Sequence, residues 1–143
     1  MDEEWTPATF LAALEATGEL VLALEGSSMG ARWAEAGALA VRSIALRPPR
    51  WGDVVVFDRN GRWYAHRVIL RVGDRFWTKG DARWAWDRPL VRRGDILGVA
   101  TALLVAGSRV PVVPSARATL VELVRAVAAW PALAWRRPPA RAR

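Results

Sequence analysis

Apolar and polar positions alternate most regularly in the segment GDVVVFDRNGRWYAHRVIL, residues 52–70. Two runs rich in β-branched and aromatic residues flank Asn60-Gly61, a dipeptide that favours the positive φ angles of a tight turn. The segment therefore predicts a β-hairpin. Side chains alternate between the two faces of a strand. The second strand is expected to present one set on each face: Tyr64, His66, Val68 and Leu70, and Trp63, Ala65, Arg67 and Ile69.

Apolar runs of strand length also precede and follow the hairpin, with turn residues between them. They are ELVLALEG (19–26), ALAVRSIAL (38–46), RFWTK (75–79), DILGVATALLV (95–105) and RVPVV (109–113), the last as an edge strand. A helix is predicted over residues 7–17, because Pro7 suits a first helical turn and Gly18 suits a helix end. A second helix is predicted over residues 118–135. The pattern predicts a mainly β fold with a short helix at each end.

The 143 residues of the chain suit one compact domain with a sizeable core. No repeat or linker divides the sequence. We expect an N-terminal helical segment over residues 1–19 and a β domain over residues 20–114. A C-terminal helix should follow over residues 115–135, and then a basic tail over residues 136–143.

Composition narrows the chemistry that the chain can support. It has no cysteine, which excludes disulfides and thiolate catalysis, and its one histidine, His66, leaves a metal site short of nitrogen ligands. We therefore expect no metal and no cofactor. The net charge is +7, but four of the arginines lie within residues 136–143. No basic stripe with interleaved aromatic residues is found, so nucleic acid is not an expected partner.

The C-terminal segment is the nearest candidate for contact with a membrane. Residues 118–135 are apolar but contain Glu122, Arg125 and Pro131, and the segment is short for a bilayer span. Two alternatives stay open: a helix packed on the domain, and a helix lying at a membrane surface. The N-terminus is acidic, unlike the basic start of a signal peptide. We expect a cytoplasmic protein, with peripheral membrane contact through residues 118–143 as the alternative to a purely internal packing role.

Two parts of the chain offer a nucleophile and a base. The segment GSSMG, residues 26–30, follows a predicted strand, and its glycines allow a sharp turn that exposes a serine hydroxyl. A hydroxyl needs a nearby base to become a nucleophile, and His66 is the only imidazole. A lone histidine on a strand face is also common in a protein core. Spacing leaves both interpretations open, because such pairs are recognised by geometry.

The order of several short segments resembles the signal-peptidase-like serine peptidases, a superfamily that includes the LexA-type repressors. The segments are GSSM, GDVVVF, HRVI, TKGDA and ILGV, which together span most of residues 20–105. The resemblance implies a fold of coiled antiparallel sheets. In bacterial leader peptidases and in LexA the general base is a lysine. His66 occupies that position here, as in the archaeal and endoplasmic-reticulum branch, which uses a Ser-His pair.

The resemblance implies roles for individual residues. Ser28, directly before Met29, matches the nucleophile, and His66 matches the general base. Asp87 matches the aspartate that orients the histidine. Asp81 matches the aspartate of the Thr-Lys-Gly-Asp segment. We expect Asp81 to be structural and to bond the backbone at a turn, with orientation of the histidine as its alternative role.

Two further residues are candidates at the same site. The Ser28 backbone N–H would hold the oxyanion together with a second donor. Leader peptidases often supply that donor from a serine two residues before the nucleophile; this chain has Gly26 there, which leaves Ser27 as the candidate. Lys79 is the only lysine, and its place in Thr-Lys-Gly-Asp favours a structural or substrate-contact role over that of a base.

The chain departs from the family pattern in three places. Ala31 stands where proline is usual, Gly26 replaces the oxyanion serine, and no segment before Ser28 is apolar enough to anchor it in a membrane. Two tryptophans, Trp84 and Trp86, lie just before the aspartate that matches the orienting residue. They either wall a substrate groove or cap the core.

One functional hypothesis and one alternative follow. We expect a serine endopeptidase that cleaves a precursor or leader peptide bound as an extended strand. The alternative is a catalytically decayed peptidase fold that acts as a binding or regulatory module. LexA-like self-cleavage is less favoured, because the residues before the first strand are too few for a helix-turn-helix unit. The oligomeric state stays open.

Overall fold

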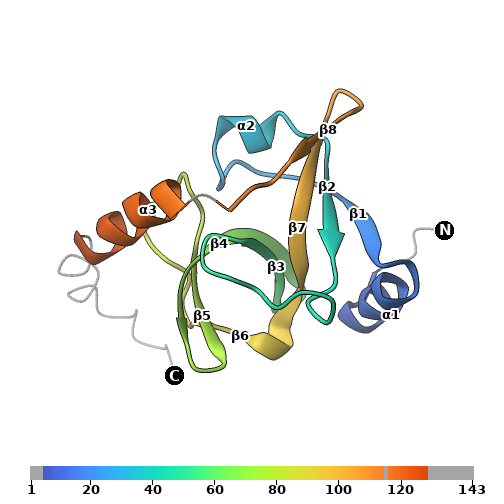
Figure 1. The fold of residues 1–143 in the computed structure, drawn as a ribbon, viewed down its shortest axis with the longest axis horizontal. Coiled ribbons are helices and arrows are strands. Elements are labelled where there is room, and N and C mark those ends of the chain that lie inside the picture. The colour runs from blue at the N-terminus through green and yellow to red at the C-terminus, as the bar shows by residue number, and fades with distance from the viewer. Residues whose placement is uncertain (1–4, 115, 129–143) are drawn as a thin grey trace, which may run out of the picture.

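The described residues, 5–114 and 116–128 of a computed structural model, form one curved antiparallel sheet with short helices around it (Figure 1). The helices are α1 (Pro7–Thr17), α2 (Ala31–Ala34) and α3 (Ala116–Ala128), with a 3-10 turn, η1, at Arg93–Asp95. The strands are β1 (Glu19–Ala23), β2 (Ala38–Arg42), β3 (Val54–Arg59), β4 (Arg62–Val72), β5 (Arg75–Lys79), β6 (Val91–Arg92), β7 (Ile96–Val105) and β8 (Ser108–Pro111). The predicted mainly β fold is confirmed, and its strands belong to one continuous sheet.

The long strand β7 lies in the middle of this sheet. One of its edges pairs with β2, and the other pairs first with β3 and then with β8. The order along the sheet is β1-β2-β7-β3-β4-β5-β6. Because the sheet coils, the end of β1 and the start of β4 line the same cavity although three strands lie between them in this order. That coiling creates the site described below.

The predicted hairpin is formed by β3 and β4, which join at Asn60 and Gly61. These residues have φ angles of 56° and 77°, the left-handed values of a two-residue type I′ turn. His66 of β4 pairs with Val55 of β3, so the side chains of these two residues lie on the same face of the hairpin. The strand β4 is longer than the predicted one.

A register shift between Val68 and Leu70 interrupts the pairing of β4 with β5. Ile69 is the extra residue of the resulting bulge, and a bulge bends the strand and interrupts its pairing locally. Strict alternation predicts Ile69 on the face of Trp63. Ile69 packs with Trp86 and Ala126, in a cluster separate from the one that Trp63 joins, and its predicted face stays a prediction.

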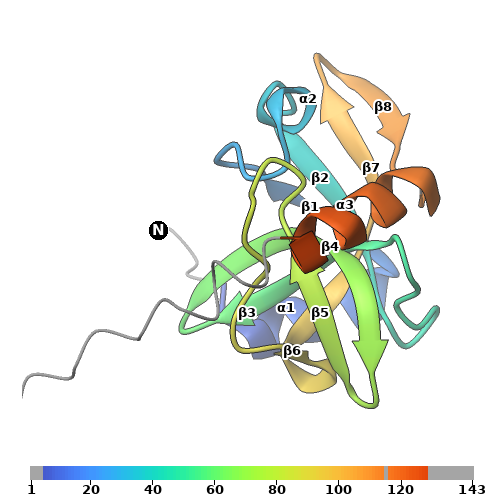
Figure 2. The same cartoon turned by 90° about the vertical axis from the view of Figure 1, so that its left-hand side faces the viewer.

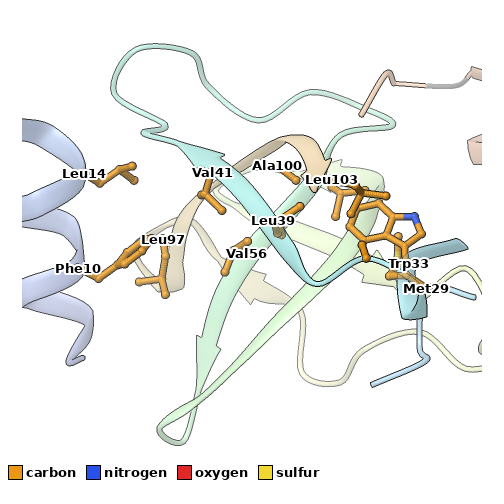
Figure 3. Close-up of a cluster of buried hydrophobic side chains, with 12 residues drawn as sticks. Phe10, Leu14, Met29, Trp33, Leu39, Val41, Val56, Leu97, Ala100 and Leu103 are labelled. Atoms are coloured by element: carbon orange, nitrogen blue, oxygen red, sulfur yellow. The ribbon is translucent and has the colours of Figure 1, made fainter. Parts of the chain in front are cut away.

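Strand β3 is buried on both faces, and each face has its own apolar cluster. The larger cluster consists of Phe10, Leu14, Met29, Trp33, Ala36, Leu39, Val41, Val54, Val56, Leu97, Ala100 and Leu103. The smaller one consists of Val55, Phe57, Val68, Phe76, Val91, Ile96 and Val99. Figure 3 shows Phe10 and Leu14 of α1 at one end of the larger cluster, and Met29 and Trp33 at the other. The residue after Ser28 is therefore anchored in the main core.

The strand predicted over residues 38–46 is shorter in the structure, since β2 ends at Arg42. The Ser43 hydroxyl accepts a hydrogen bond from the Ala45 N–H at 3.1 Å. A local side-chain bond of this kind competes with strand pairing. The chain consequently turns after Arg42 although the residues are apolar.

Helix α3 lies against β4 and is tied to the sheet by a buried ion pair (Figure 2). Its inner side buries Thr119, Glu122 and Ala126. The Glu122 carboxylate accepts a hydrogen bond from the ammonium group of Lys79, a residue of β5 with no exposed surface. It also accepts one from Arg125 at 3.0 Å.

The outer side of α3 is apolar. Leu120, Val121, Val124 and Val127 are each at least 43% exposed. None of the helices within residues 5–114 and 116–128 has the length and apolar character needed to cross a bilayer. Residues 129–143, which include the end of the predicted helix and the basic tail, lie outside the described residues. Contact of residues 118–143 with a membrane surface stays a prediction.

Loss of the buried ion pair should destabilise the fold. Glu122→Ala leaves the Lys79 ammonium buried without a carboxylate, and breaking such a pair costs about 3–5 kcal/mol of unfolding free energy. Urea unfolding followed by tryptophan fluorescence measures the change, with Glu15→Ala on the exposed side of α1 as the control. Lys79→Met combined with Glu122→Leu should recover most of the loss. An unfolding midpoint of Glu122→Ala equal to that of the parent would contradict this account.

Candidate functional site

The segment that leaves β1 presents Ser28 on a tight turn. Gly26 has a φ angle of 91°, which glycine adopts without strain. The Gly30 N–H donates to the Ser27 carbonyl at 3.0 Å and closes the turn around Ser28. The buried side chain of Met29 fixes the turn from the core side. The nucleophile predicted from the sequence therefore lies on a short, anchored loop.

His66 reaches this turn from β4. Its side chain is almost fully buried, with 3% of the residue exposed, and its ring lies edge-on to Phe57 at a centroid distance of 5.9 Å. The Nε2 atom lies 3.0 Å from the Ser28 Oγ. The fold thus brings together two residues that are 38 positions apart in the sequence.

The other ring nitrogen of His66 contacts Asp87. Nδ1 lies 2.7 Å from Oδ2 of Asp87, and the same oxygen accepts a hydrogen bond from the Thr78 hydroxyl at 2.6 Å. The Asp87 N–H donates to the Thr78 carbonyl at 2.8 Å. Because a carboxylate can only accept, Nδ1 carries the proton of the neutral ring. The unprotonated Nε2 then accepts the hydrogen bond that the Ser28 hydroxyl donates.

This series of hydrogen bonds contains the parts of a Ser-His-Asp triad. The Nε2 atom of His66 is placed to take the proton of the Ser28 hydroxyl, and Asp87 is placed to stabilise the imidazolium that forms. Within the described residues, no acceptor binds the Ser28 backbone N–H. A free N–H at the nucleophile can stabilise a developing oxyanion. Ser27 is exposed and lines the same cleft as Ser28.

Asp81 does not reach the histidine. Its two carboxylate oxygens accept hydrogen bonds from the guanidinium of Arg67 at 2.8 and 2.6 Å. Arg67 also donates to the Gly52 carbonyl at 2.9 Å. The partner of the Asp81 side chain is thus a buried arginine of β4, whereas the sequence predicts backbone groups at a turn. The Asp81 backbone N–H does contact the turn, since it donates to the Met29 sulfur at 3.4 Å.

Lys79 is enclosed between β5 and α3. Besides Glu122, its ammonium group donates to the Gly80 carbonyl at 3.3 Å. Complete burial keeps it away from a substrate, and its proton donors are committed to these acceptors. The position of Lys79 therefore does not support the predicted substrate-contact role. It agrees with the predicted structural role.

Two functional neighbours, Thr78 and Gly80, are missed by the sequence analysis. A Cβ on Gly80 would lie 2.5 Å from the Ser28 carbonyl oxygen and 3.2 Å from Nε2 of His66, so only glycine allows this close approach. The Ala82 N–H donates to the same Ser28 carbonyl at 2.9 Å. Both residues belong to the Thr-Lys-Gly-Asp segment. In the sequence, that segment indicates only the order typical of the family, and it gives no sign that Thr78 and Gly80 contact the site.

An apolar cavity of about 250 Å³ opens beside Ser28, between the end of β1 and the start of β4. Its apolar lining comprises Leu22, Ala23, Leu24, Met29, Trp33, Leu39, Val56, Trp63 and Ala65. β4 pairs with β5 only from Arg67 onward, so residues 62–66 have an unpaired edge on that side within the described part of the chain. β1 is the last strand of the sheet. An extended peptide could form backbone hydrogen bonds at these edges.

The two tryptophans before Asp87 have different environments. Trp84 is 76% exposed and lines a shallow hollow together with Ser27 and Ser28. Trp86 is only 7% exposed and packs edge-on against Trp77, with ring centroids 5.0 Å apart. Trp84 therefore walls a groove, while Trp86 caps the core.

A scan against protein-family models and searches of curated proteins and of solved structures found no match.

The hydrogen bonds of His66 predict its tautomer. The neutral imidazole should carry its proton on Nδ1, because Asp87 can only accept there. Since the chain has a single histidine, ¹⁵N NMR of the imidazole reports this residue alone. Asp87→Asn, whose amide can donate to Nδ1, should shift the population toward the Nε2–H tautomer. An Nε2–H tautomer in the parent protein would contradict the observed network.

Proposed function

We propose that this chain is a serine endopeptidase of the signal-peptidase-like type, which cleaves a precursor or leader peptide with Ser28 as nucleophile and His66 as general base. The observation that carries the proposal is the pair of contacts at His66, 3.0 Å to the Ser28 hydroxyl and 2.7 Å to the Asp87 carboxylate. A nucleophile, a base and an orienting acid in direct contact are the elements that this reaction requires.

The reaction proceeds through an acyl-enzyme. His66 Nε2 takes the hydroxyl proton while the Ser28 oxygen attacks the substrate carbonyl carbon, and the carbonyl oxygen gains the negative charge. The imidazolium then gives its proton to the leaving amine as the peptide bond breaks. A water molecule, deprotonated by the same nitrogen, attacks the Ser28 ester, and the acid product leaves as the imidazolium returns the proton to the Ser28 oxygen. Asp87 stabilises the positive ring in both halves.

The substrate in this proposal lies extended along the free edges of β1 and β4. One of its side chains enters the apolar cavity beside Ser28, and its scissile carbonyl faces the Ser28 backbone N–H. Unpaired strand edges supply affinity through backbone hydrogen bonds, and pockets between them supply side-chain selectivity. This arrangement suits an unfolded precursor segment.

A decayed site is the alternative hypothesis, and it predicts a Ser28 hydroxyl out of reach of His66. The 3.0 Å contact favours the peptidase instead. Ala31 is the first residue of α2, a position that tolerates proline but does not require it. Gly26 has a positive φ angle that a serine would adopt only with strain. These two departures from the family pattern therefore agree with the local backbone and are compatible with activity.

Removal of either partner of the central contact should abolish cleavage. We expect Ser28→Ala and His66→Ala each to lower kcat/KM for peptide hydrolysis at least about a thousandfold, because triad residues act as a unit. The assay is mass-spectrometric detection of products from a mixed synthetic peptide library.

Ser108→Ala is the matched control, since it removes an exposed serine hydroxyl from β8, outside the cleft that contains Ser28. It should retain most of the cleavage, and circular dichroism should show all three variants folded. Peptide products formed equally by the parent and by Ser28→Ala would refute the peptidase proposal.

Thr78 acts as a positioning residue through Asp87. Thr78→Val removes one hydrogen bond to the carboxylate, and such bonds to charged groups are worth about 1.5–3 kcal/mol, which predicts a roughly 10- to 100-fold fall in kcat. KM should change little, and Thr78→Ser should restore the rate. Equal losses in the valine and serine variants would indicate a packing role instead.

A further inference from the structure

Two exposed arginines border the cleft that contains Ser28, and neither has a side-chain partner among the described residues. Arg62, at the start of β4, and Arg83, in the loop after β5, both line the cleft of about 700 Å³ that also contains Ser28 and His66. Neither guanidinium forms an ion pair or a hydrogen bond with another described residue. Two cations from separate parts of the chain thus line the cleft that holds Ser28 and His66.

A third arginine of the cleft adds to this charge. Arg59, at the end of β3, donates to the carbonyl oxygens of Arg88 and Pro89 at 3.1 and 2.7 Å, and its guanidinium lies over the Phe57 ring at 5.3 Å. These contacts fix the position of the side chain. They leave its charge uncompensated, because neither carbonyl groups nor a ring supply a full negative charge.

The acidic residues of the cleft do not neutralise these arginines. Asp87 is committed to His66 and Thr78, and 16% of its side chain is exposed. Glu25 lines both the cleft and the apolar cavity, so it lies where the two hollows meet. The cleft therefore presents three guanidinium groups and one uncommitted carboxylate.

We propose that the peptide cleaved at this site carries acidic residues close to the scissile bond, which bind Arg62 and Arg83, and an aliphatic residue that enters the apolar cavity. This proposal rests on the peptidase function proposed above. Guanidinium groups pair with carboxylates in a bidentate geometry. The lining of the adjacent cavity suits an apolar side chain, which a peptide offers and a nucleic acid does not. An acidic precursor segment satisfies both surfaces.

The volume of the apolar cavity indicates the size of the substrate side chain that fits it. At about 250 Å³ it is several times the ~30 Å³ that one water molecule occupies in the liquid. An alanine methyl group would leave most of it unfilled, and the lining would lose its contacts. Leucine or a residue of similar size fits better. The site thus selects a larger apolar residue on one side and carboxylates on the other.

The test uses the full chain and a synthetic peptide library whose cleavage sites are identified by mass spectrometry. Only cleavages absent in Ser28→Ala are counted. We expect aspartate and glutamate to be enriched near the cleaved bonds, together with an aliphatic residue at one fixed position. Three copies of the best peptide, with glutamate, glutamine or lysine at the enriched acidic positions, then give kcat and KM separately.

Charge reversal identifies the arginines responsible. The double variant Arg62→Glu/Arg83→Glu should raise KM for the glutamate peptide about tenfold with little change in kcat, and should prefer the lysine peptide. The matched control, Arg75→Glu/Arg92→Glu, makes the same charge change at exposed positions on β5 and β6 outside the cleft. It should keep the parental preference. Added salt should weaken cleavage of the glutamate peptide more than that of the glutamine peptide.

The outcomes separate the two proposals. Ser28-dependent cleavage with equal efficiency for the glutamate, glutamine and lysine peptides overturns the acidic-substrate inference and leaves the peptidase function standing. If the Arg62/Arg83 double variant keeps the parental preference for the glutamate peptide, the acidic-substrate inference is likewise overturned and the peptidase function stands. No Ser28-dependent cleavage of any peptide in the library overturns both.

Discussion

The site depends on the way in which one imidazole is held between two hydrogen bonds. Three contacts restrict the rotation of the His66 ring. Phe57 packs edge-on against it, Asp87 bonds Nδ1 and the Ser28 hydroxyl bonds Nε2. Each contact comes from a different segment of the chain. The tautomer, the direction of the hydroxyl proton and the position of the nucleophile all follow from this arrangement. An apolar residue at position 66 would fill the same space, but the Asp87 carboxylate would then lose the hydrogen bond that it accepts from Nδ1.

Several interactions around the triad restrict the movement of these segments. Gly80 brings the end of β5 close to the carbonyl of Ser28, where a larger residue would clash. The Arg67–Asp81 ion pair joins β4 to the loop that follows β5, and Lys79 joins β5 to α3. The loop that carries Asp87 is thus attached to β4, the strand of His66, through Asp81, and to β5 through the bond of the Asp87 N–H to the Thr78 carbonyl. This explains why charged residues are buried so close to a site that needs a fixed geometry.

The sequence was informative where local patterns determine structure. The hairpin at Asn60-Gly61 and the helix before Gly18 follow from turn chemistry and periodicity. The bulge at Ile69 was not predictable, because it depends on the pairing of β4 with β5. Similarly, no local pattern indicates that Glu122 in the last described helix neutralises Lys79. Such contacts arise from tertiary packing between segments far apart in the chain.

The candidate site shows the same division. Ser28, His66 and Asp87 could be named in advance because a family resemblance supplied the order of segments, while the strand pattern alone favoured a core histidine. The second oxyanion donor and the substrate could not be derived in this way, since they depend on backbone direction and on the shape of the cleft. Thr78 became visible only through its contact with Asp87.

The rate at which Ser28 reacts with a fluorophosphonate tests the central claim most directly, because it measures the nucleophilicity of one hydroxyl without requiring a substrate. We predict that peptide mapping finds the label on Ser28, and that His66→Ala slows labelling at least about a hundredfold, the usual contribution of a general base. Labelling at the same rate in the parent and in folded His66→Ala, or a label on another residue, would contradict the claim that His66 activates Ser28.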